Sequence, residues 1–301
     1  MVLAGVLYGF LINSFILSLL AMGFTLQYVT MSVPNLAYGS IAFFSTYISL
    51  TMVLLNLSPY LGLPISFAIC AIISVLLYKF LAFLRDRGMP VMGLMMATLV
   101  FDLLAYAFTN IYADMLSSFL QAYGRSFSLA EYDFTIGGTP GVLLVSGIIA
   151  VSFALGFHLM LTKTKFGIAM RATVENISLA SVQGVNTDKV LLVAWLLVGG
   201  IAGVSGSLYP LWLYMDPWVG ARMFVSIFAA CVVGGIRSIY GSLFGGFLIA
   251  ACETVITYEL SLVIGEWIWP YRTVISLLIA AVFLLFAPNG VAGLIERARR
   301  R

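Results

Sequence analysis

Long apolar stretches, separated by short polar clusters, fill almost the whole chain. A helix that crosses the hydrocarbon core of a membrane needs about 20 mostly apolar residues. The apolar stretch between Arg222 and Gly234, the seventh along the chain, is short, so it is typical of a helix that enters the membrane only part of the way as well as of one that crosses it. The pattern therefore predicts an all-α, polytopic integral membrane protein with eight or nine transmembrane helices, in a single transmembrane domain over residues 1–301. The expected spans are 5–29, 36–56, 63–84, 91–110, 141–162, 189–212, 222–237, 241–258 and 271–287.

The composition excludes a water-soluble globular protein. Of the 301 residues, 62% are hydrophobic and 9% are charged, whereas an ordinary soluble domain carries about 25% charged residues. The mean hydropathy is +1.09 and the formal net charge is +3, so we expect the outer surface to face lipid and expect no nucleic-acid binding. The first charged residue is Lys79, so the first apolar stretch lacks the basic start of a secretory signal and is expected to remain as a span.

The charges of the loops predict the orientation of the chain, because Lys and Arg accumulate in short cytoplasmic loops. Nine crossings would place the N-terminus outside the cell membrane and the C-terminus in the cytoplasm. The loops expected inside carry Lys79, Arg85 and Arg87, then Lys163, Lys165, Arg171 and Lys189, and finally Arg297, Arg299, Arg300 and Arg301. The loops expected outside carry Asp114, Glu131, Asp133, Asp216, Glu259 and Glu266.

The longest expected external connection runs from Asn110 to Gly141. It ends in the helix-breaking cluster 137–141, which contains three glycines and a proline. A connection of this length either receives an external partner or only links two spans.

Among the expected cytoplasmic parts of the chain, the 163–189 segment is best suited to contact a partner protein. Its small residues recur three or four positions apart, which predicts a short helix with a narrow face. Gly184 predicts the end of that helix, and Asn186 offers a cap for the next span. Arg171 and Glu175 are spaced to pair on its exposed side, for about 0.2–0.5 kcal/mol. Such a helix is either a docking surface or a mere connector. Its narrow face consists of Ala169, Ala172, Asn176, Leu179 and Ala180.

Two carboxylates lie inside expected spans, Asp102 in the fourth and Glu253 in the eighth. An ionisable group at the centre of a bilayer costs about 2.5–3.5 kcal/mol on insertion scales, so it is a candidate for a transport pathway. The alternative is that both groups lie toward the ends of their spans and reach water or a neighbouring helix.

A second group of pathway candidates follows Pro34, whose ring disfavours helix at the preceding residue. A broken helix exposes free backbone N–H and C=O groups that can line a cavity, and the N-terminus of a helix attracts a carboxylate. A simple kink or an interfacial loop is the alternative. The candidates are Asn35, Tyr38, Gly39 and Ser40.

The remaining features favour structural roles, and no metal or cofactor is expected. His158 is the single histidine, with no partner at ligand spacing, so we expect it at the membrane interface. Glycine pairs with a spacing of four permit close packing of helices. These pairs are Gly5/Gly9, Gly199/Gly203 and Gly241/Gly245.

Three motifs in the same order resemble the branched-chain amino acid permease family of ATP-binding-cassette (ABC) importers. Residues 23–26 with 34–39 resemble its G-L-x-L…N-F-A-[HY]-G element. Residues 234–246 resemble its glycine-rich turn, although Arg237 replaces a usual glycine and Tyr240 a usual proline. The 163–189 segment resembles its cytoplasmic coupling loop. The matching positions of that loop are Gly167, Arg171, Ala172, Glu175, Asn176, Ala180, Gly184, Val185 and Asn186.

The resemblance implies the shorter of the family's two permease subunits. Such a chain forms part of a pathway for branched-chain or related small amino acids, together with a second permease chain, two ABC ATPase subunits and an extracytoplasmic solute-binding protein. The coupling residues that it implies are Arg171, Ala172, Glu175, Asn176, Ala180 and Gly184.

The sequence has no Gly-Lys-Ser or Gly-Lys-Thr phosphate loop, so we expect no ATPase of its own and no enzyme activity. Two other functions remain open. An ion-coupled carrier would use Asp102 or Glu253 to bind a proton or sodium, and related permeases carry urea or short-chain amides. An intramembrane enzyme is disfavoured, because no catalytic cluster of His, Cys, Asp or Glu is evident.

Overall fold

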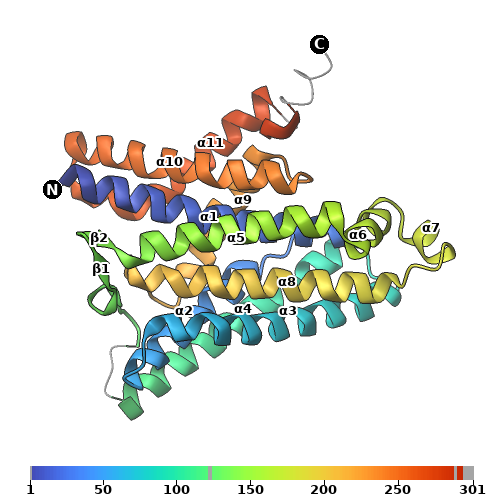
Figure 1. The fold of residues 1–301 in the computed structure, drawn as a ribbon, viewed down its shortest axis with the longest axis horizontal. Helices are drawn as coiled ribbons and strands as arrows, with labels where there is room; N and C mark the ends of the chain where they lie inside the picture. The colour runs from blue at the N-terminus through green and yellow to red at the C-terminus, as the bar shows by residue number, and fades with distance from the viewer. Residues whose placement is uncertain (1, 121–123, 288–289, 294–301) are drawn as a thin grey trace.

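The computed structural model describes residues 2–120, 124–287 and 290–293, which form a bundle of long helices (Figure 1). In lipid, backbone polar groups must bond within their own segment, which is why long apolar runs fold as helices. The long helices are α1 (Val2–Met31), α2 (Tyr38–Leu54), α3 (Gly62–Asp86), α4 (Val91–Leu120), α5 (Gly141–Lys163), α8 (Thr187–Leu208), α9 (Val219–Gly234), α10 (Ile239–Ile264) and α11 (Arg272–Phe286). The shorter ones are α6 (Lys165–Glu175), α7 (Ile177–Val182) and the 3₁₀ turns η1 (Pro59–Leu61), η2 (Ala130–Tyr132), η3 (Tyr209–Leu211) and η4 (Glu266–Tyr271).

Each of the nine expected spans coincides with one of the long helices. Within the described residues, seven helices are long and apolar enough to cross a membrane, whereas α2 and α9 are apolar but have only 17 and 16 residues. The predicted end of the fourth span at residue 110 is wrong, because α4 continues to Leu120. The number of full crossings, and with it the side of the N-terminus, stays a prediction.

The core of the bundle is organised around α8, which is the most deeply buried of the seven long spans. α8 packs along α3, and α1 packs along α10. Gly199 and Gly203 of α8 lie directly against the backbone of α3, and Gly241 and Gly245 of α10 lie against that of α9. The predicted packing role of these two pairs is confirmed. The prediction is wrong at Gly5, where a side chain would meet open space.

The chain is interrupted between α1 and α2, as the Pro34 signal predicts. α1 ends at Met31, Ser32 adopts a positive φ of 56°, and α2 begins only at Tyr38. The hydroxyl of Tyr38 lies against Gly23, well before the end of α1. The chain therefore folds back along α1 before the second helix starts.

The end of the bundle that carries the N-terminus also carries the only strands of the described residues, so the expected all-α fold needs a small correction (Figure 1). β1 (Thr135–Ile136) and β2 (Thr139–Pro140) form an antiparallel hairpin. Gly137 and Gly138 close it with φ values of 59° and 80°, which suit the two-residue turn of a hairpin. We call this end of the bundle the hairpin end.

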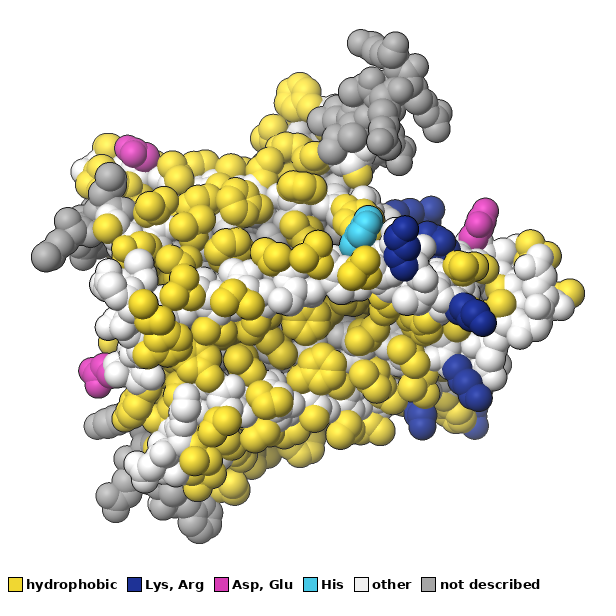
Figure 2. All heavy atoms as spheres, in the orientation of Figure 1, with side chains coloured by type: hydrophobic (Ala, Val, Ile, Leu, Met, Phe, Trp, Pro, Cys, Tyr) yellow, Lys and Arg dark blue, Asp and Glu magenta, His cyan; other side chains and the backbone are white. Residues whose placement is uncertain are grey.

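Basic side chains gather at the opposite end, beside α6 and α7, on the face that Figure 2 shows. On the same face, the hairpin end shows acidic side chains and no Lys or Arg. Of the arginines near the hairpin end, Arg125 and Arg222 are paired with Asp114 and Asp216, whereas Arg272 forms no ion pair within the described residues. This uneven charge is the pattern from which the orientation is predicted, and the orientation itself stays a prediction. The arginines at 297–301 lie outside the described residues.

Candidate functional site

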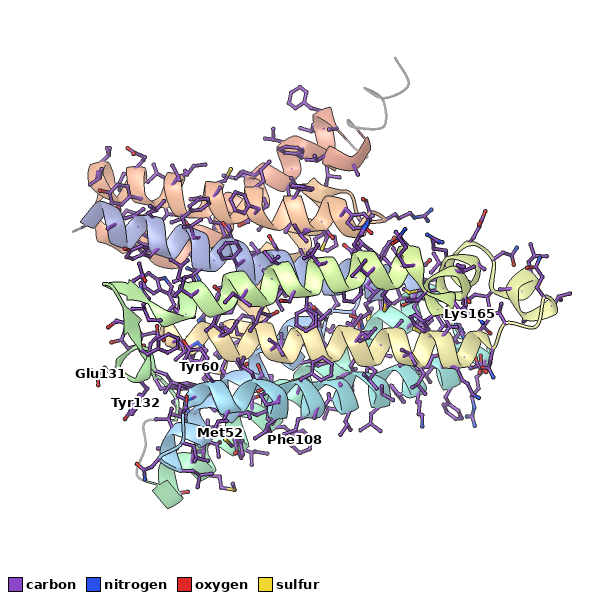
Figure 3. All side chains as sticks on the ribbon, viewed as in Figure 1. Met52, Tyr60, Phe108, Glu131, Tyr132 and Lys165 are labelled. Carbon is purple, nitrogen blue, oxygen red and sulfur yellow. The ribbon has the colours of Figure 1, made fainter. Side chains whose placement is uncertain are left out.

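The 163–189 segment projects from the basic end of the bundle as two helices, α6 and α7 (Figure 1). Figure 3 shows Lys165, at the start of α6, at the opposite end from Glu131 and Tyr132. The Thr164 side chain caps α6 by accepting a hydrogen bond from the N–H of Gly167, at 3.1 Å. The single expected helix is divided at Asn176, whose side chain accepts from the N–H of Leu179 at 3.0 Å and so starts α7.

The end of this segment agrees with the sequence prediction. Gly184 follows α7 with a φ of 85°, a conformation that suits glycine. The Asn186 side chain accepts a hydrogen bond from the N–H of Lys189 at 3.0 Å and so caps α8. The expected pair of Arg171 and Glu175 is wrong, since the ion pairs of the described residues do not include it.

The two helices attach to the bundle by one face and leave the other open. Met170 and Thr173 of α6 and Ala180 of α7 are buried, whereas Arg171, Glu175, Asn176 and Gly184 are exposed and Ala172 is half-buried. Several apolar side chains beside these exposed candidates are also open, and Val182 is 85% exposed. We call them the apolar face of α6–α7: Ile168, Val174, Ile177, Leu179 and Val182.

The structure brings the pathway candidates after Pro34 into contact with other helices. Asn35 is buried, and its side-chain oxygen accepts from the N–H of Ala37 at 3.0 Å, while its Nδ2 has no hydrogen-bond partner. The Tyr38 hydroxyl is likewise buried without a partner. Gly39 lies against the backbone of Gly220, so the first turns of α2 and α9 approach closely. A side chain at either glycine would separate them.

Asp102 and Ser40, predicted independently, face one another across α4 and α2. The Asp102 carboxyl group lies near the Ser40 side chain, and its Oδ1 atom is buried with no hydrogen-bond partner. Ser40 also lines a small hollow of about 10 Å³ beside Tyr106 and Asp216. Ser40 therefore lies beside a small gap between helices.

Glu253 lies at the centre of a buried polar cluster that joins four helices and η3. Its Oε1 accepts hydrogen bonds from Ser226 of α9, at 2.5 Å, and from Ser276 of α11. Its Oε2 accepts from the Nδ2 of Asn13 of α1 at 3.4 Å, and the Oδ1 of Asn13 accepts from the Tyr209 hydroxyl at 3.0 Å. Glu253 is 1% exposed, so it does not line an open cavity. Sequence reasoning missed its partners, because single Ser and Asn residues inside spans carry no distinctive spacing.

Sequence reasoning also missed a hollow of about 650 Å³ at the hairpin end, which we call the outer hollow. Its charged lining residues are Asp216, Arg222 and Arg272, which belong to three different segments. In the sequence each looks like a residue that flanks a span. The remaining lining residues are Leu213, Tyr214, Met215, Val219, Met223, Trp269 and Thr273.

The single histidine, which we expect at the membrane interface, lies on the surface of the bundle. His158 is exposed, and its Nδ1 lies 3.0 Å from the Tyr240 hydroxyl. Among the residues that the structure describes, no group of three or more His, Cys, Asp or Glu is arranged to hold a metal ion.

Residues 6–288 match the family described as "Branched-chain amino acid transport system / permease component". The chain belongs to this permease family. One relative is similar over almost the whole chain. The permease is 42% identical, over 96% of its own length and 92% of the relative's, to the probable branched-chain amino acid transport permease protein LivH of Methanocaldococcus jannaschii. The family resemblance drawn from the three motifs is thereby confirmed.

A second relative is more distant and covers less of the permease. The high-affinity branched-chain amino acid transport system permease protein LivH of Escherichia coli K12 is 29% identical over 48% of the chain and 46% of the relative. A solved structure, PsaBC from Streptococcus pneumoniae in complex with Fab, covers 94% of the permease and 92% of its own chain, with a TM-score of 0.55 and 12% identity. This last likeness concerns the fold alone. The protein is thus a multi-pass membrane transport permease.

Proposed function

We propose that this permease is a membrane subunit of an ATP-driven importer of branched-chain amino acids. Family membership and the 42% identity to a probable branched-chain amino acid permease support the substrate class. In this proposal the chain resides in the cell membrane with its C-terminus in the cytoplasm. It pairs with a second permease subunit, receives its substrate from an extracytoplasmic solute-binding protein, and is driven by two ABC ATPase subunits.

The proposal that the ATPases dock at the 163–189 segment rests on the apolar face of α6–α7. Its side chains lie at the basic end of the bundle, where the chain leaves the apolar part of the molecule, so lipid would not cover them. Apolar side chains that stay open to water mark contact sites when they cluster. Arg171 and Glu175 both lie on α6 and have no ion-pair partner among the described residues, so both charges are free to pair with a docked subunit.

Docking is tested by replacing Val182 with aspartate. Burying a valine contributes about 1.5–3 kcal/mol, so its loss should weaken binding to the ATPase by about tenfold or more. The matched control is Val263→Asp, because Val263 is also 85% exposed but lies in the last turn of α10, toward the hairpin end. The measurement is co-purification and titration of the ATPase with each permease variant in nanodiscs. Equal binding of the ATPase to both variants would contradict the proposed docking site.

Reconstituted vesicles test the source of energy and the substrate. Leucine uptake should require the ATPases and ATP, should be lost with Glu175→Arg, and should persist without an ion gradient. Uptake that an ion gradient drives in the absence of the ATPases would instead select the ion-coupled carrier. Uptake of urea or a short-chain amide in place of leucine would overturn the substrate class.

A further inference from the structure

The outer hollow combines the two charge types of an amino acid with an apolar wall. Arg222 and Arg272 supply positive charge and Asp216 supplies negative charge. Val219, Met223 and Trp269 form an apolar wall beside them. Small-molecule sites are typically clefts of about 300–1,000 Å³ that are mostly apolar and carry a few convergent polar groups. The outer hollow, at about 650 Å³, has both properties.

Arg272 is the group in this hollow that is available to bind an anion. It is half-buried, and the hydrogen bond that the structure gives its guanidinium is a long one of 3.9 Å to the sulfur of Met223. Arg222, by contrast, already donates to the Oδ2 of Asp216 at 2.5 Å. A guanidinium matches the geometry of a carboxylate by donating two parallel hydrogen bonds. Arg272 is also the first residue of α11, which follows η4 directly, so its position is fixed by the junction of these two helices.

Asp216 is held in place for a positively charged group. Its Oδ1 accepts from the N–H of Trp218 at 2.8 Å, and its Oδ2 accepts from Arg222. These two bonds orient the carboxylate while leaving each oxygen free to accept another donor, since an ionised carboxylate has about four acceptor positions. An ammonium group in the hollow would find its acceptor here.

A second hollow, of about 290 Å³, adjoins the first and extends it toward the buried cluster. The two hollows share Leu213, Trp269 and Arg272 as lining residues. The second hollow is also lined by Asn13, which donates to Glu253. A solute held at Arg272 would therefore lie between the outer end of the molecule and its polar centre.

We propose that the outer hollow binds the zwitterion of an aliphatic α-amino acid. Arg272 receives the carboxylate, Asp216 receives the ammonium group, and the wall of Val219, Met223 and Trp269 receives the branched side chain. This inference rests on the proposed function, because it takes the solute to be a branched-chain amino acid. It adds the place at which the permease itself holds that solute.

The test is binding of radiolabelled leucine to the complete transporter complex in nanodiscs without the solute-binding protein. Arg272→Gln should raise the leucine Kd by about tenfold or more, because a charge-assisted pair is lost. Arg272→Lys should retain part of the affinity, since lysine keeps the charge without the two-pronged geometry. The matched control is Arg125→Gln, an exposed arginine at the same end that pairs with Asp114 outside the hollow and should bind leucine as the unaltered protein does.

Two analogues distinguish loss of this contact from general damage. 4-Methylpentanoate keeps the carboxylate of leucine but lacks the ammonium group, and 3-methylbutylamine keeps the ammonium group but lacks the carboxylate. In the unaltered complex both should compete with leucine weakly. Arg272→Gln should abolish competition by 4-methylpentanoate and leave competition by 3-methylbutylamine unchanged, a pattern that a misfolded variant would not produce.

Leucine uptake by the same complex with its solute-binding protein is measured in parallel. If uptake is normal but the complex binds no leucine, or if Arg272→Gln binds all three compounds as the unaltered complex does, the outer hollow is not the site and the proposed function stands. If there is no leucine uptake, the proposed function fails and the inference fails with it. Loss of affinity in Arg272→Gln but not in Arg125→Gln, with the predicted analogue pattern, supports the site.

Discussion

Replacing Glu253 with leucine removes the acceptor that three buried donors share. Ser226 and Ser276 donate to Oε1, and Asn13 donates to Oε2. A buried donor left without a partner costs about 1–3 kcal/mol. The two serine hydroxyls lie 3.4 Å apart and can bond to each other after the change, which leaves two donors unpaired. We therefore expect Glu253→Leu to lower the free energy of unfolding by about 2–6 kcal/mol.

The glutamine variant refines this expectation. Glu253→Gln keeps an oxygen for the two serines, but its amide nitrogen faces the Nδ2 of Asn13, so two donors oppose each other. If the Asn13 amide turns over, its Oδ1 accepts from the glutamine nitrogen and its Nδ2 donates to the Tyr209 hydroxyl oxygen. Only the Tyr209 hydroxyl hydrogen then lacks an acceptor, and we expect a loss of about 1–3 kcal/mol. The order of stability should be unaltered protein, then Glu253→Gln, then Glu253→Leu.

The assay is unfolding of the purified permease by SDS titration in detergent micelles, followed by circular dichroism. The control is Glu259→Leu, which removes an exposed carboxylate from the same helix and should change the free energy of unfolding by no more than about 0.5 kcal/mol. If Glu253→Leu is as stable as Glu259→Leu, the buried cluster does not hold these helices together and the reasoning is refuted.

Two further changes test the packing and the coupling segment. Gly203→Val should prevent assembly of α8 on α3, because its Cβ would collide with the α3 backbone. The control is Gly156→Val, where the added atom meets open space, which should leave the thermal unfolding temperature in detergent almost unchanged. Equal unfolding temperatures of the two variants would contradict the close approach of α8 and α3. Asn176→Ala should remove the cap of α7 at a cost of about 1 kcal/mol, and should therefore raise the rate of amide hydrogen exchange in residues 177–182. An unchanged exchange rate in these residues would show that α7 does not depend on this cap.

The spans were predictable because an apolar run of sufficient length has few other ways to fold in lipid. The end of α4 was not, and the reason is local. Thr109 and Asn110 look like the polar edge of a span, yet in the structure each bonds back to its own helix: Thr109 Oγ1 donates to the carbonyl of Ala105 at 2.8 Å, and Asn110 Nδ2 donates to that of Tyr106 at 2.9 Å. Polar side chains that satisfy themselves in this way let the helix continue.

The candidate sites were predictable only where their residues are close in the sequence. The end of α7 at Gly184 and the cap at Asn186 follow from local chemistry and were anticipated. The division of the segment at Asn176 was not, because asparagine at a small-residue position fits the face of one continuous helix as well as the start of a second. The outer hollow joins Asp216 to Arg272 by packing between helices, and no spacing in the sequence encodes that contact.

The backbone bridge between Phe127 and Met215 links two connections at the hairpin end. Phe127 N–H donates to the Met215 carbonyl at 3.1 Å, and Met215 N–H donates back to Phe127 at 2.8 Å. Asp216 follows Met215 directly, so the backbone bonds between Met215 and Phe127 also limit the movement of the Asp216 carboxylate relative to the stretch that leads into η2. In the importer proposed above, a solute-binding protein that docked on this stretch would also move Asp216, and its docking would thereby change the position of the carboxylate that we propose as the ammonium acceptor.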